Sequence, residues 1–418
     1  MATVEIARVS VIGLGYIGLP TAAIIANRGL SVVGVDIDEA VVRKLNQGQV
    51  HIVEPELDVL VHAAVSSGNF RAALQPEPSD VFLIAVPTPF KDHHLADLQY
   101  IEAASHSIAP VLRSGNLVIL ESTSPVGATE KMVEWLAAAR PDLSFPRRGF
   151  SSFSDIHVAH CPERVLPGRI LQELVGNDRV IGGMTPACSQ HAIAFYKTFV
   201  SGSCLVTDAR TAEMTKLTEN SFRDVNIAFA NELSLVCERL NVNVWELIEL
   251  ANHHPRVNIL QPGPGVGGHC IAVDPWFIVE AAPDLARLIR TAREVNNSKP
   301  HWVIEKIKAA SNNFKSPKVA CLGLAFKPDI DDLRESPALE IVCCVAEEIQ
   351  GDILVVEPFI EAMPKVLEKF SNVRLTDAEL ALREADVVVL LVNHRQFLSI
   401  DRELLKGKMV IDTRGAWR

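Results

Sequence analysis

The sequence predicts an α/β protein whose two doubly wound domains are joined by a long central helix. Two apolar runs that lead into glycine, at residues 9–15 and 319–325, are each followed by a helical stretch and a second apolar run that ends in an acid, Asp36 or Glu357. This order of strand, helix and strand is typical of parallel sheets covered by helices. Residues 208–240 contain neither Pro nor Gly and repeat apolar residues at helical spacing, which predicts the central helix.

The two strand–helix–strand segments predict a duplication, with chance similarity between short strands as the alternative. Apolar runs at 81–86, 117–120 and 156–160 extend the first domain, and runs at 387–392 and 409–411 extend the last. We expect an N-terminal domain over 1–207, a central helical dimerisation region over 208–310 and a C-terminal domain over 311–418. A helix of about 33 residues is nearly 50 Å long, more than one small domain needs. It is therefore expected to link the two domains and to pack against a second subunit.

Composition restricts the classes of partner. The 418 residues include 40 Lys and Arg against 51 Asp and Glu, a net charge of −11, and 48% are hydrophobic. Such a chain can bury a large core, and its acidic excess argues against nucleic acid or an anionic membrane as a partner. No apolar run approaches the roughly 20 residues that span a bilayer, and the first residues lack signal-peptide features. The eight cysteines are scattered with no CxxC pair, as expected for reduced thiols in a cytoplasmic enzyme.

A glycine motif follows the first predicted strand. Gly13-Leu-Gly15-Tyr-Ile-Gly18 fits G-x-G-x-x-G, and Asp36 ends the next strand 18 residues later. Such glycines let the backbone turn tightly and approach a pyrophosphate at a helix N-terminus, as in Rossmann-like dinucleotide sites. Asp36 is expected to accept hydrogen bonds from a ribose and to repel a 2′-phosphate, so NAD is favoured over NADP. The alternative is a glycine-rich turn with no ligand.

Hydroxyl groups follow two further strands of the same sheet. The strand ends at 85–89 and 120–125 carry Thr88 and Thr123. The carboxyl edge of a doubly wound sheet is where such folds bind ligands. Taken alone, each segment is equally consistent with a turn or a helix cap.

The middle of the chain carries a candidate nucleophile. Cys270 comes directly after Gly267-Gly-His, so its thiol is expected to be reachable, whereas the other seven cysteines have surroundings typical of small core residues. Lys216 and Asn220 lie one helical turn apart, and Arg223 lies two turns from Lys216 on the same stripe. These side chains are candidates to hold an oxyanion or a water, and a solvated helix face is the alternative.

Basic and aromatic residues in loops favour a second ligand. Phe326-Lys327 follows the first strand of the C-terminal domain and Arg334 precedes its next helix, which suits a phosphate-bearing ligand whose base or ribose packs on Phe326. The alternative is a salt bridge to Asp331 or Asp332. His254-Pro-Arg256 adds a basic cluster. A metal site is not expected, because acidic or thiol partners at the usual spacing are lacking around His253, His254 and His269.

Taken together, these motifs resemble the UDP-glucose/GDP-mannose dehydrogenase family. The resemblance rests on the glycine motif and on Cys161-Pro-Glu163-Arg164, Lys216-x-x-x-Asn220 and Gly267-Gly-x-Cys270 with Asp274. It covers essentially the whole chain, in the family's order of NAD domain, long central helix and nucleotide-sugar domain. It implies that a UDP-sugar C6 alcohol is oxidised to a carboxylate with two NAD. Cys270 is implied to form a thiohemiacetal and then a thioester, with Lys216 and Asn220 stabilising the oxyanion.

The resemblance also implies roles for further residues. Thr123 and Asp274 are implied to hold the catalytic water, and Glu163 to assist hydrolysis of the thioester. The implied contacts to NAD are Gly13, Gly15, Tyr16, Ile17, Gly18, Asp36, Thr88 and Thr123. The implied contacts to the nucleotide sugar are Arg164, Val165, Lys216, Asn220, Arg223, His254, Arg256, Gly267, Phe326, Lys327 and Arg334. Relatives form dimers across the central helix, which implies a homodimer or larger homo-oligomer in which Arg256 reaches a neighbour's site, and Arg414 is implied to touch either ligand.

The choice of sugar is read from finer similarity. Stretches 218–226, 254–265 and 331–337 look closest to family members that oxidise UDP-N-acetyl-D-mannosamine to the uronate for bacterial surface polysaccharides. Val273 stands where UDP-glucose enzymes usually carry Lys, and Ala272 replaces a Pro common in UDP-N-acetylglucosamine enzymes. Both favour a UDP-N-acetylhexosamine of the mannosamine type. The alternatives are another UDP-sugar, UDP-N-acetylglucosamine included, and a nucleotide-binding protein without turnover, against which the intact Cys270, Lys216 and Asn220 argue.

Overall fold

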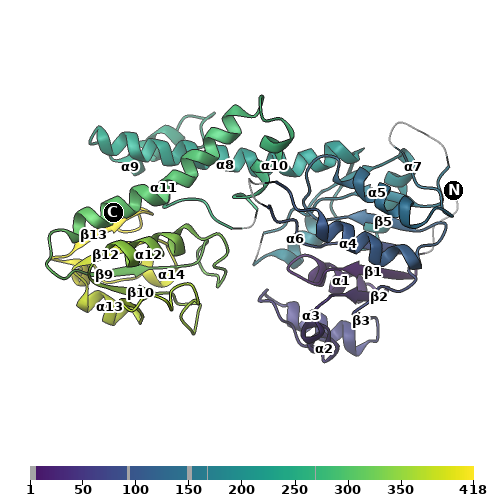
Figure 1. The fold of residues 1–418 in the computed structure, drawn as a ribbon, viewed down its shortest axis with the longest axis horizontal. Helices are drawn as coiled ribbons and strands as arrows, with labels where there is room; N and C mark the ends of the chain where they lie inside the picture. Colours follow the sequence, from purple (N-terminus) through teal and green to yellow (C-terminus); the bar gives the residue numbers. More distant parts are fainter. Residues whose placement is uncertain (1–5, 92–94, 148–152, 167, 269) are drawn as a thin grey trace. The chain divides into compact units, whose positions relative to one another are not determined.

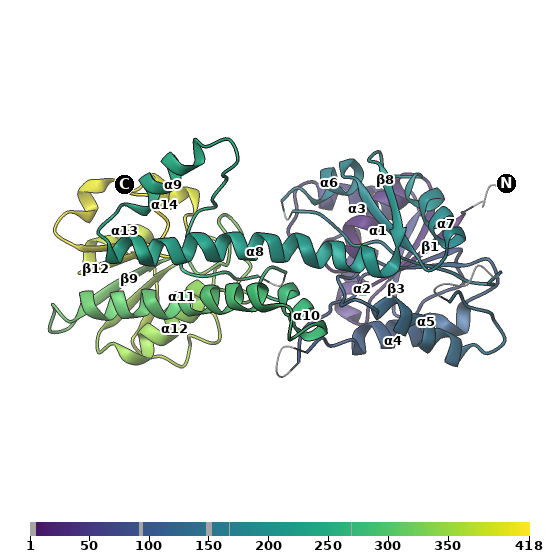
Figure 2. The ribbon, with the colours of Figure 1, turned by 90° about the horizontal axis from the view of Figure 1, so that it is seen from above.

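The computed structural model describes residues 6–91, 95–147, 153–166, 168–268 and 270–418 (Figure 1). The chain divides into two compact units, Met1–Glu219 and Asn220–Arg418. The division falls within helix α8 (Ala209–Arg239), the long helix in Figure 2. Each unit is described by itself.

The first unit is a doubly wound α/β domain. Its described strands form one sheet in the order β3-β2-β1-β4-β5-β6-β7-β8, in which only the β6–β7 pair is antiparallel. The strands are β1 (Arg8–Ile12), β2 (Ser31–Val35), β3 (Phe70–Ala73), β4 (Val81–Ile84), β5 (Leu117–Leu120), β6 (His157–His160), β7 (Arg179–Gly183) and β8 (Cys204–Asp208). The helices before α8 are α1 (Gly18–Asn27), α2 (Glu39–Asn46), α3 (Leu57–Ser66), α4 (Gln99–Ile108), α5 (Ala128–Ala139), α6 (Ile170–Gly176) and α7 (Pro186–Tyr196).

Helices cover both faces of this sheet. Buried side chains of α1, α3, α6 and α7 form one apolar core with the strands, and those of α4 and α5 form a second core on the opposite face. Strands buried on both faces read as continuous apolar runs, and this is why β4 and β5 could be located in the sequence. The predicted run 81–86 is a strand only to Ile84, so its last residues lie in the loop at the carboxyl edge.

The second unit repeats the first five strands of the first. Its sheet has the order β11-β10-β9-β12-β13, all parallel, which corresponds to β3-β2-β1-β4-β5. The elements are β9 (Lys318–Leu322), α12 (Pro337–Glu348), β10 (Asp352–Val356), β11 (Val373–Leu375), α13 (Ala378–Glu384), β12 (Val387–Leu390), α14 (Arg395–Leu398) and β13 (Met409–Asp412). Helices α11 (Arg287–Ser311) and α12 cover one face, and α13 and α14 the other.

The first turns of the two sheets match in detail. The N–H of Gly13 donates to the Val35 carbonyl over 2.8 Å, and the N–H of Gly323 donates to the Val356 carbonyl over the same distance. Both glycines have a left-handed backbone, with φ of +91° and +97°. The predicted pair of Rossmann-like domains is therefore confirmed, and the shared strand order and turn geometry support duplication over chance.

Helix α8 has 31 residues and confirms the predicted central helix. Its second half packs along α11 within the second unit, and the two run side by side in Figure 2. Buried Arg293 on α11 donates to Asp224 over 2.6 Å, and Asn231 donates to Asn296 over 2.9 Å. The connection between them contains α9 (Val244–Asn252) and α10 (Asp274–Ala281).

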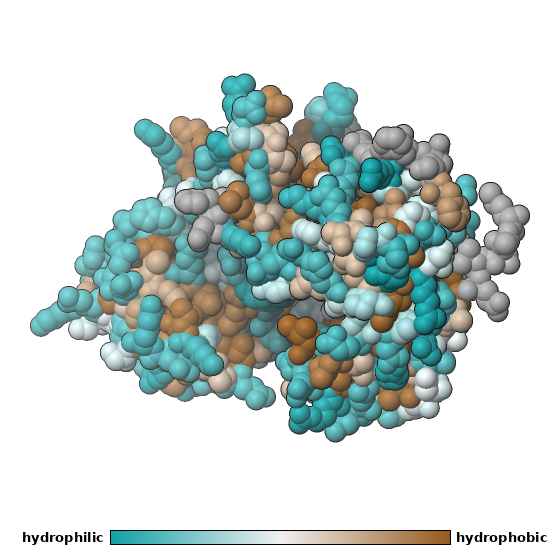
Figure 3. Space-filling model, turned by 45° about the vertical axis from the view of Figure 1, so that its right-hand side comes forward, coloured by the Kyte–Doolittle hydropathy of each residue, from teal (hydrophilic) through white to brown (hydrophobic). Residues whose placement is uncertain are grey.

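The surface and the cysteines complete the description. Hydrophilic side chains cover most of the face seen in Figure 3, with smaller hydrophobic areas between them. No helix within the described ranges is both long and apolar enough to cross a bilayer. All eight cysteines are thiols. The prediction of seven core cysteines is wrong for Cys204, Cys343 and Cys344, which are only half-buried because β8 is an edge strand and α12 turns one side toward solvent.

Candidate active site

The glycine motif forms the turn between β1 and α1. A side chain at Gly18 would place its Cβ 1.8 Å from the Gly13 carbonyl oxygen, so only glycine allows this close approach. Gly15 is exposed, and a Cβ placed on it would have no other atom within 4 Å. Asp36, at the end of β2, accepts the N–H of Leu14 over 3.0 Å. The turn thus offers a ligand an accessible glycine backbone beside a partly exposed carboxylate.

Tyr16 and Ile17 complete this turn. Both are half-buried, and Tyr16 packs against the core that contains α1. Across the carboxyl edge of the sheet, the Thr88 hydroxyl donates to the Thr123 carbonyl oxygen. Ser122 donates to the Val86 carbonyl over 2.6 Å. The predicted hydroxyl residues after β4 and β5 are therefore brought together.

A buried ionic cluster forms around Glu163, which follows β6 by three residues. The Arg179 guanidinium donates to one oxygen of Glu163, and the other oxygen accepts the N–H of Arg164 over 2.9 Å. Glu121, which directly follows β5, lies 3.9 Å from the same Arg179 nitrogen and accepts the Tyr196 hydroxyl over 2.8 Å. Glu163 was expected in a site, whereas Arg179, Glu121 and Tyr196 were not. The available signal was the charge at Arg179 and Glu121, which border otherwise apolar strands.

The segment after Glu163 begins with Arg164 and Val165. The Arg164 guanidinium lies 2.7 Å from Glu219, and Val165 packs against the first core. Glu54 holds the far end of this segment, accepting the N–H groups of Gly168 and Ile170 over 2.8 Å each. The segment is thereby fixed at both ends.

Cys270 begins the turn that leads into α10. Its carbonyl oxygen accepts the N–H of Asp274 over 2.8 Å, so Asp274 follows the cysteine by one helical turn. The Asn220 side chain of α8 donates to the Asp274 carboxylate, and both are buried. Cys270 is half-buried. Half-buried Lys216 precedes Asn220 by one turn of α8. The structure therefore brings Cys270, Asp274 and Asn220 together, as predicted for a catalytic group.

The glycine loop before Cys270 packs on the loop after β9. A Cβ at Gly267 would lie 2.2 Å from the Glu335 carbonyl oxygen, and one at Gly268 would lie 2.8 Å from the Phe326 ring. Arg334 donates to both Asp332 oxygens, over 2.9 Å and 2.6 Å. The salt bridge weighed as an alternative thus forms. The Arg334 guanidinium is half-exposed. Exposed ion pairs contribute only about 0–1 kcal/mol to the stability of a fold, so this pair can open readily.

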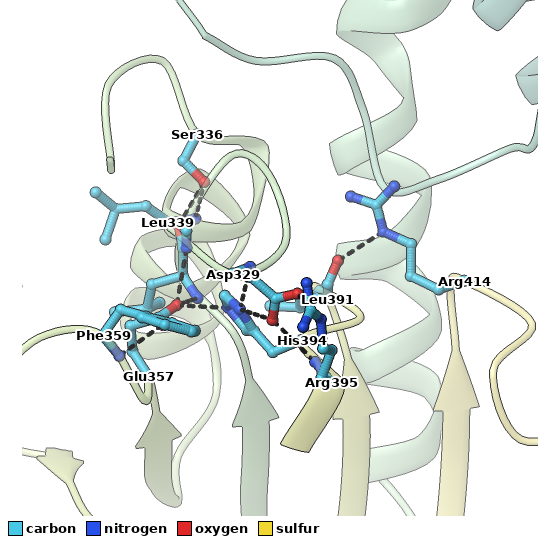
Figure 4. Close-up of polar contacts among 11 residues, drawn as sticks. Asp329, Ser336, Leu339, Glu357, Phe359, Leu391, His394, Arg395 and Arg414 are labelled. Atoms are coloured by element: carbon cyan, nitrogen blue, oxygen red, sulfur yellow. Dashed lines mark hydrogen bonds and ion pairs between the residues drawn. The ribbon is translucent and has the colours of Figure 1, made fainter. Parts of the chain in front are cut away.

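A buried His–Glu pair supports that loop (Figure 4). Glu357 accepts the N–H groups of Leu324 and Ala325 over 2.7 Å and 3.0 Å. His394 Nδ1 accepts the N–H of Asp329 over 2.9 Å, so its Nε2 carries the proton that faces Glu357 at 3.1 Å. This pair anchors the backbone on both sides of Phe326 and Lys327. Glu357 has the position of Asp36 in the first unit, but these contacts bury it.

The remaining predicted residues lie on the surface or in separate contacts. Arg223 is exposed on α8, and His254 and Arg256 are exposed in the loop after α9. Arg414 is partly buried in the second unit, where its Nε donates to the Leu391 carbonyl over 3.0 Å and desolvation lowers its pKa to about 10. Within the described residues, no three or more His, Cys, Asp or Glu side chains are grouped so that they could hold a metal ion. His269 lies outside the described residues.

Comparisons with known proteins agree along the whole chain. Models of the NAD binding, central and UDP binding domains of the UDP-glucose/GDP-mannose dehydrogenase family match residues 7–200, 210–298 and 320–418. The chain is 63% identical to the "NDP-N-acetyl-D-galactosaminuronic acid dehydrogenase" of Ralstonia nicotianae over 99% of this chain and 97% of that protein. It is 60% identical to the "UDP-N-acetyl-D-mannosamine dehydrogenase" of Yersinia pestis over 98% and 99% of the two chains.

Solved structures share the architecture. The UDP-N-acetyl-mannosamine dehydrogenase Cap5O from S. aureus superposes with a TM-score of 0.86 at 44% identity, covering 98% of this chain and 95% of that one. The three matched domains and these full-length relatives lead to one conclusion. The chain belongs to the UDP-glucose/GDP-mannose dehydrogenase family.

Proposed function

We propose that the chain is an NAD-dependent UDP-sugar 6-dehydrogenase that oxidises the C6 alcohol of UDP-N-acetyl-D-mannosamine to the uronate. The observation that carries this proposal is the arrangement of a half-buried thiol at Cys270, one helical turn before a carboxylate that binds Asn220. A nucleotide-binding protein without turnover has no need of this group. The product would serve as a precursor for bacterial surface polysaccharide.

The turn after β1 suits NAD. Gly13 and Gly18 allow the tight turn, and Gly15 exposes its backbone beside the N-terminus of α1. Tyr16 and Ile17 complete the turn, and Thr88 and Thr123 follow the adjoining strands β4 and β5. Asp36 supplies the carboxylate for a ribose. The chemistry that bound NAD supplies is acceptance of the electron pair removed from C6 in each of two oxidations.

Cys270 provides the covalent step. Its thiolate adds to the C6 aldehyde left by the first oxidation, forming a C–S bond and a thiohemiacetal. Oxidation of this adduct gives a thioester. Water then breaks the C–S bond, which leaves the carboxylate and returns the thiol to Cys270. Two NAD and one water are consumed per sugar.

Polar side chains around the thiol would stabilise these steps. Lys216 and Asn220 are proposed to bind the developing oxyanion, with Lys216 also exchanging a proton. Asp274 and Thr123 are proposed to hold the water, and the Asn220–Asp274 hydrogen bond supports a shared task for that pair. Both Glu163 oxygens already accept hydrogen bonds. This supports a role in orienting the Arg164 segment as much as one in hydrolysis.

The second unit is proposed to hold the UDP-sugar. Phosphate would be met by Lys327 and by Arg334 once it leaves Asp332, while the ring of Phe326 packs on the base or ribose. The remaining contacts proposed for the nucleotide sugar are Arg164, Val165, Arg223, His254, Arg256, Gly267 and Arg414. The matched UDP binding domain over 320–418 supports this assignment.

A second candidate substrate is UDP-N-acetyl-D-galactosamine. It is supported by the galactosaminuronic names of relatives at 63% and 62% identity, beside 62% and 60% for two relatives with the mannosamine name. The two sugars differ only in the configuration of ring substituents, which a few side chains can distinguish. The proposed domains remain 1–207, 208–310 and 311–418, and we propose a cytoplasmic homodimer or larger homo-oligomer.

The decisive experiment counts NADH released per sugar on a panel of UDP-sugars. We expect two NADH per sugar, with UDP-N-acetyl-D-mannosamine preferred over its galactosamine, glucosamine and glucose counterparts. Preference for the galactosamine sugar would select the second candidate. If NAD binds but none of the UDP-sugars is oxidised, the proposed dehydrogenase activity is refuted.

Replacing the nucleophile tests the covalent route. Cys270→Ser should lower uronate formation by about a thousandfold or more, because a hydroxyl is a far weaker nucleophile than a thiolate. NAD binding, followed by fluorescence titration, should persist. The matched control is Cys344→Ser in α12, which should keep full turnover. Normal uronate production by Cys270→Ser would exclude the thioester.

A further inference from the structure

The ionic cluster of the first unit contains one acid that the proposed reaction does not use. Glu121 is 1% exposed and follows β5 by one residue, two residues before Thr123. The Tyr196 hydroxyl donates to its Oε1 over 2.8 Å. Its Oε2 is buried and has no hydrogen-bond partner among the residues that the structure describes. A fully ionised carboxylate would be costly in this position.

The charges around Glu121 do not balance if every acid is ionised. Glu121 and Glu163 approach the same Nη1 of Arg179, and these three side chains are each at most 6% exposed. Glu163 holds the direct hydrogen bond, whereas Glu121 stands 3.9 Å away. One guanidinium therefore faces two carboxyl groups. When like charges share one buried site, one of them keeps its proton.

We propose that Glu121 is a positioning residue that holds this proton, so that Glu163 remains the ionised partner of Arg179 and keeps the Arg164 segment in place. The link to Arg164 is the 2.9 Å hydrogen bond from its N–H to Glu163 Oε1. An ionised Glu121 would compete for Arg179 and loosen that link. The inference rests on the proposed function, because the Arg164 segment matters to turnover only if it contacts the substrate.

The groups facing Glu121 agree with this assignment. They are Glu163 and Cys161 after β6, Arg179 of β7 and Tyr196 of α7. Burial and the charge of Glu163 raise the pKa of Glu121 to about 7, against the opposing influence of Arg179 and the Tyr196 hydroxyl. Burial also raises the pKa of Cys161 to about 12, so this thiol stays neutral and supplies no competing charge.

The first measurement is thermal unfolding of the full chain against pH. A folded pKa raised above the unfolded value means that the stabilising contribution of Glu121 is complete at low pH and is lost as pH rises from about 4.5 to about 7. Glu121→Gln has nearly the same shape, but its amide has no proton to lose and stays neutral across this pH range. Its Tm relative to wild type should therefore climb across this window. A difference in Tm that does not change with pH would overturn the proposal, whether or not any sugar is oxidised.

The second measurement is kcat/KM for the UDP-sugar against pH. The ratio of Glu121→Gln to wild type should rise at least about fivefold between about pH 6 and about pH 8.5, because only wild type acquires the second buried charge. Glu121→Ala, which also lacks the charge, should show the same rise from a lower kcat/KM at every pH, because it leaves Arg179 and Tyr196 beside a cavity. A rising Tm difference with a flat kcat/KM ratio would show that the proton is held but positions nothing.

Tyr196→Phe provides a test of opposite sign. The Tyr196 hydroxyl favours the ionised form of Glu121. Its removal should therefore move the pH-dependent changes in Tm and in kcat/KM to higher pH. Tyr100→Phe, the same change on the partly exposed Tyr100 of α4, is the matched control and should leave them in place. A downward shift in Tyr196→Phe would contradict the proposal.

Discussion

Asp36 has a structural task at the end of β2 and is proposed to bind the cofactor ribose. Its oxygens accept the N–H groups of Leu14 and Asp38, each over 3.0 Å, and its side chain remains partly exposed beside the glycine turn. Asp36→Asn keeps an acceptor for the turn and removes the charge that repels a 2′-phosphate. Hydrogen bonds to charged groups contribute about 1.5–3 kcal/mol, so the NAD-over-NADP ratio of kcat/KM should fall about tenfold or more.

The matched control for this change lies two residues further on. Asp38→Asn makes the same substitution in the residue that caps α2, where Asp38 accepts the Ala40 N–H over 2.8 Å. It should leave the cofactor preference unaltered. Equal preference in Asp36→Asn and wild type would remove Asp36 from the ribose.

Individual residues were predictable where a motif ties them to a turn. Cys270 and Asp274 stand close in sequence, and Asn220 was found from its spacing to Lys216 on one helix. Arg179, Glu121 and Tyr196 were not found, because their meeting depends on strands and a helix far apart in the chain. Pairing of this kind follows from the order of strands in a sheet, which hydrophobic periodicity does not specify.

The loop after β9 depends on one buried carboxylate. Burial alone would raise the pKa of Glu357, but hydrogen bonds from His394 and from the Leu324 and Ala325 N–H groups outweigh it and hold the pKa below its usual range. A lowered folded pKa gives stability that is present above the unfolded value of about 4.5 and is lost as pH falls through the folded pKa.

Glu357→Gln should therefore destabilise the protein at neutral pH and matter less in acid. With its amide oxygen toward Leu324 and Ala325, Gln would turn its NH₂ toward the Phe359 N–H, which Glu357 Oε1 accepts over 3.2 Å, and this costs about 1–3 kcal/mol. Chemical denaturation at about pH 7 and about pH 4 measures the difference. UDP binding should weaken while NAD binding is kept, since the anchored loop carries Phe326 and Lys327. Equal destabilisation at both pH values would contradict the assigned charge.

Elements were predicted more reliably than the loops between them. Helix α8 and strands β5, β9 and β12 could be predicted because buried parallel strands give continuous apolar runs and a long Pro-free helix repeats apolar residues at helical spacing. The loop after β9 leaves no such pattern. Asp329 adopts a left-handed backbone with φ of +61°, and the His394 ring that accepts its N–H comes from the loop between β12 and α14. A contact 65 residues away decides this local conformation.

At the scale of the whole chain, the same fold occurs twice, and the carboxylate at the equivalent position is partly exposed in one unit and buried in the other. Asp36 and Glu357 both follow the second strand and both accept the N–H of the residue after the turn glycine. Asp36 stays partly exposed, but Glu357 is 4% exposed. Glu357 is therefore not available to a ribose as Asp36 is proposed to be, which supports the proposal that other groups such as Lys327 hold the ligand of the second unit. This difference between the two units agrees with the matches of the first to an NAD binding domain and of the second to a UDP binding domain.

Helix α8 presents an apolar stripe that a single chain leaves uncovered. Phe222, Phe229 and Val236 follow one another at intervals of seven residues, two helical turns, and are 69%, 51% and 46% exposed. Large exposed side chains in such a row are typical of association surfaces and support the proposed homo-oligomer. In a two-fold symmetric dimer each of them is buried twice, so every substitution acts twice on the interface.

A charge in the middle of this stripe should separate the subunits. Burying a Phe side chain contributes about 1.5–3 kcal/mol, and Phe229→Glu both removes this contribution and adds a charge on each side of the two-fold axis. Light scattering after gel filtration should give wild type at least twice the chain mass of 45.7 kDa and Phe229→Glu a single mass. Val59→Glu, at a 68% exposed position of α3, is the control and should keep the wild-type mass. If Phe229→Glu also keeps it, subunits do not associate through α8, and Arg256 has no neighbouring site to reach by that route.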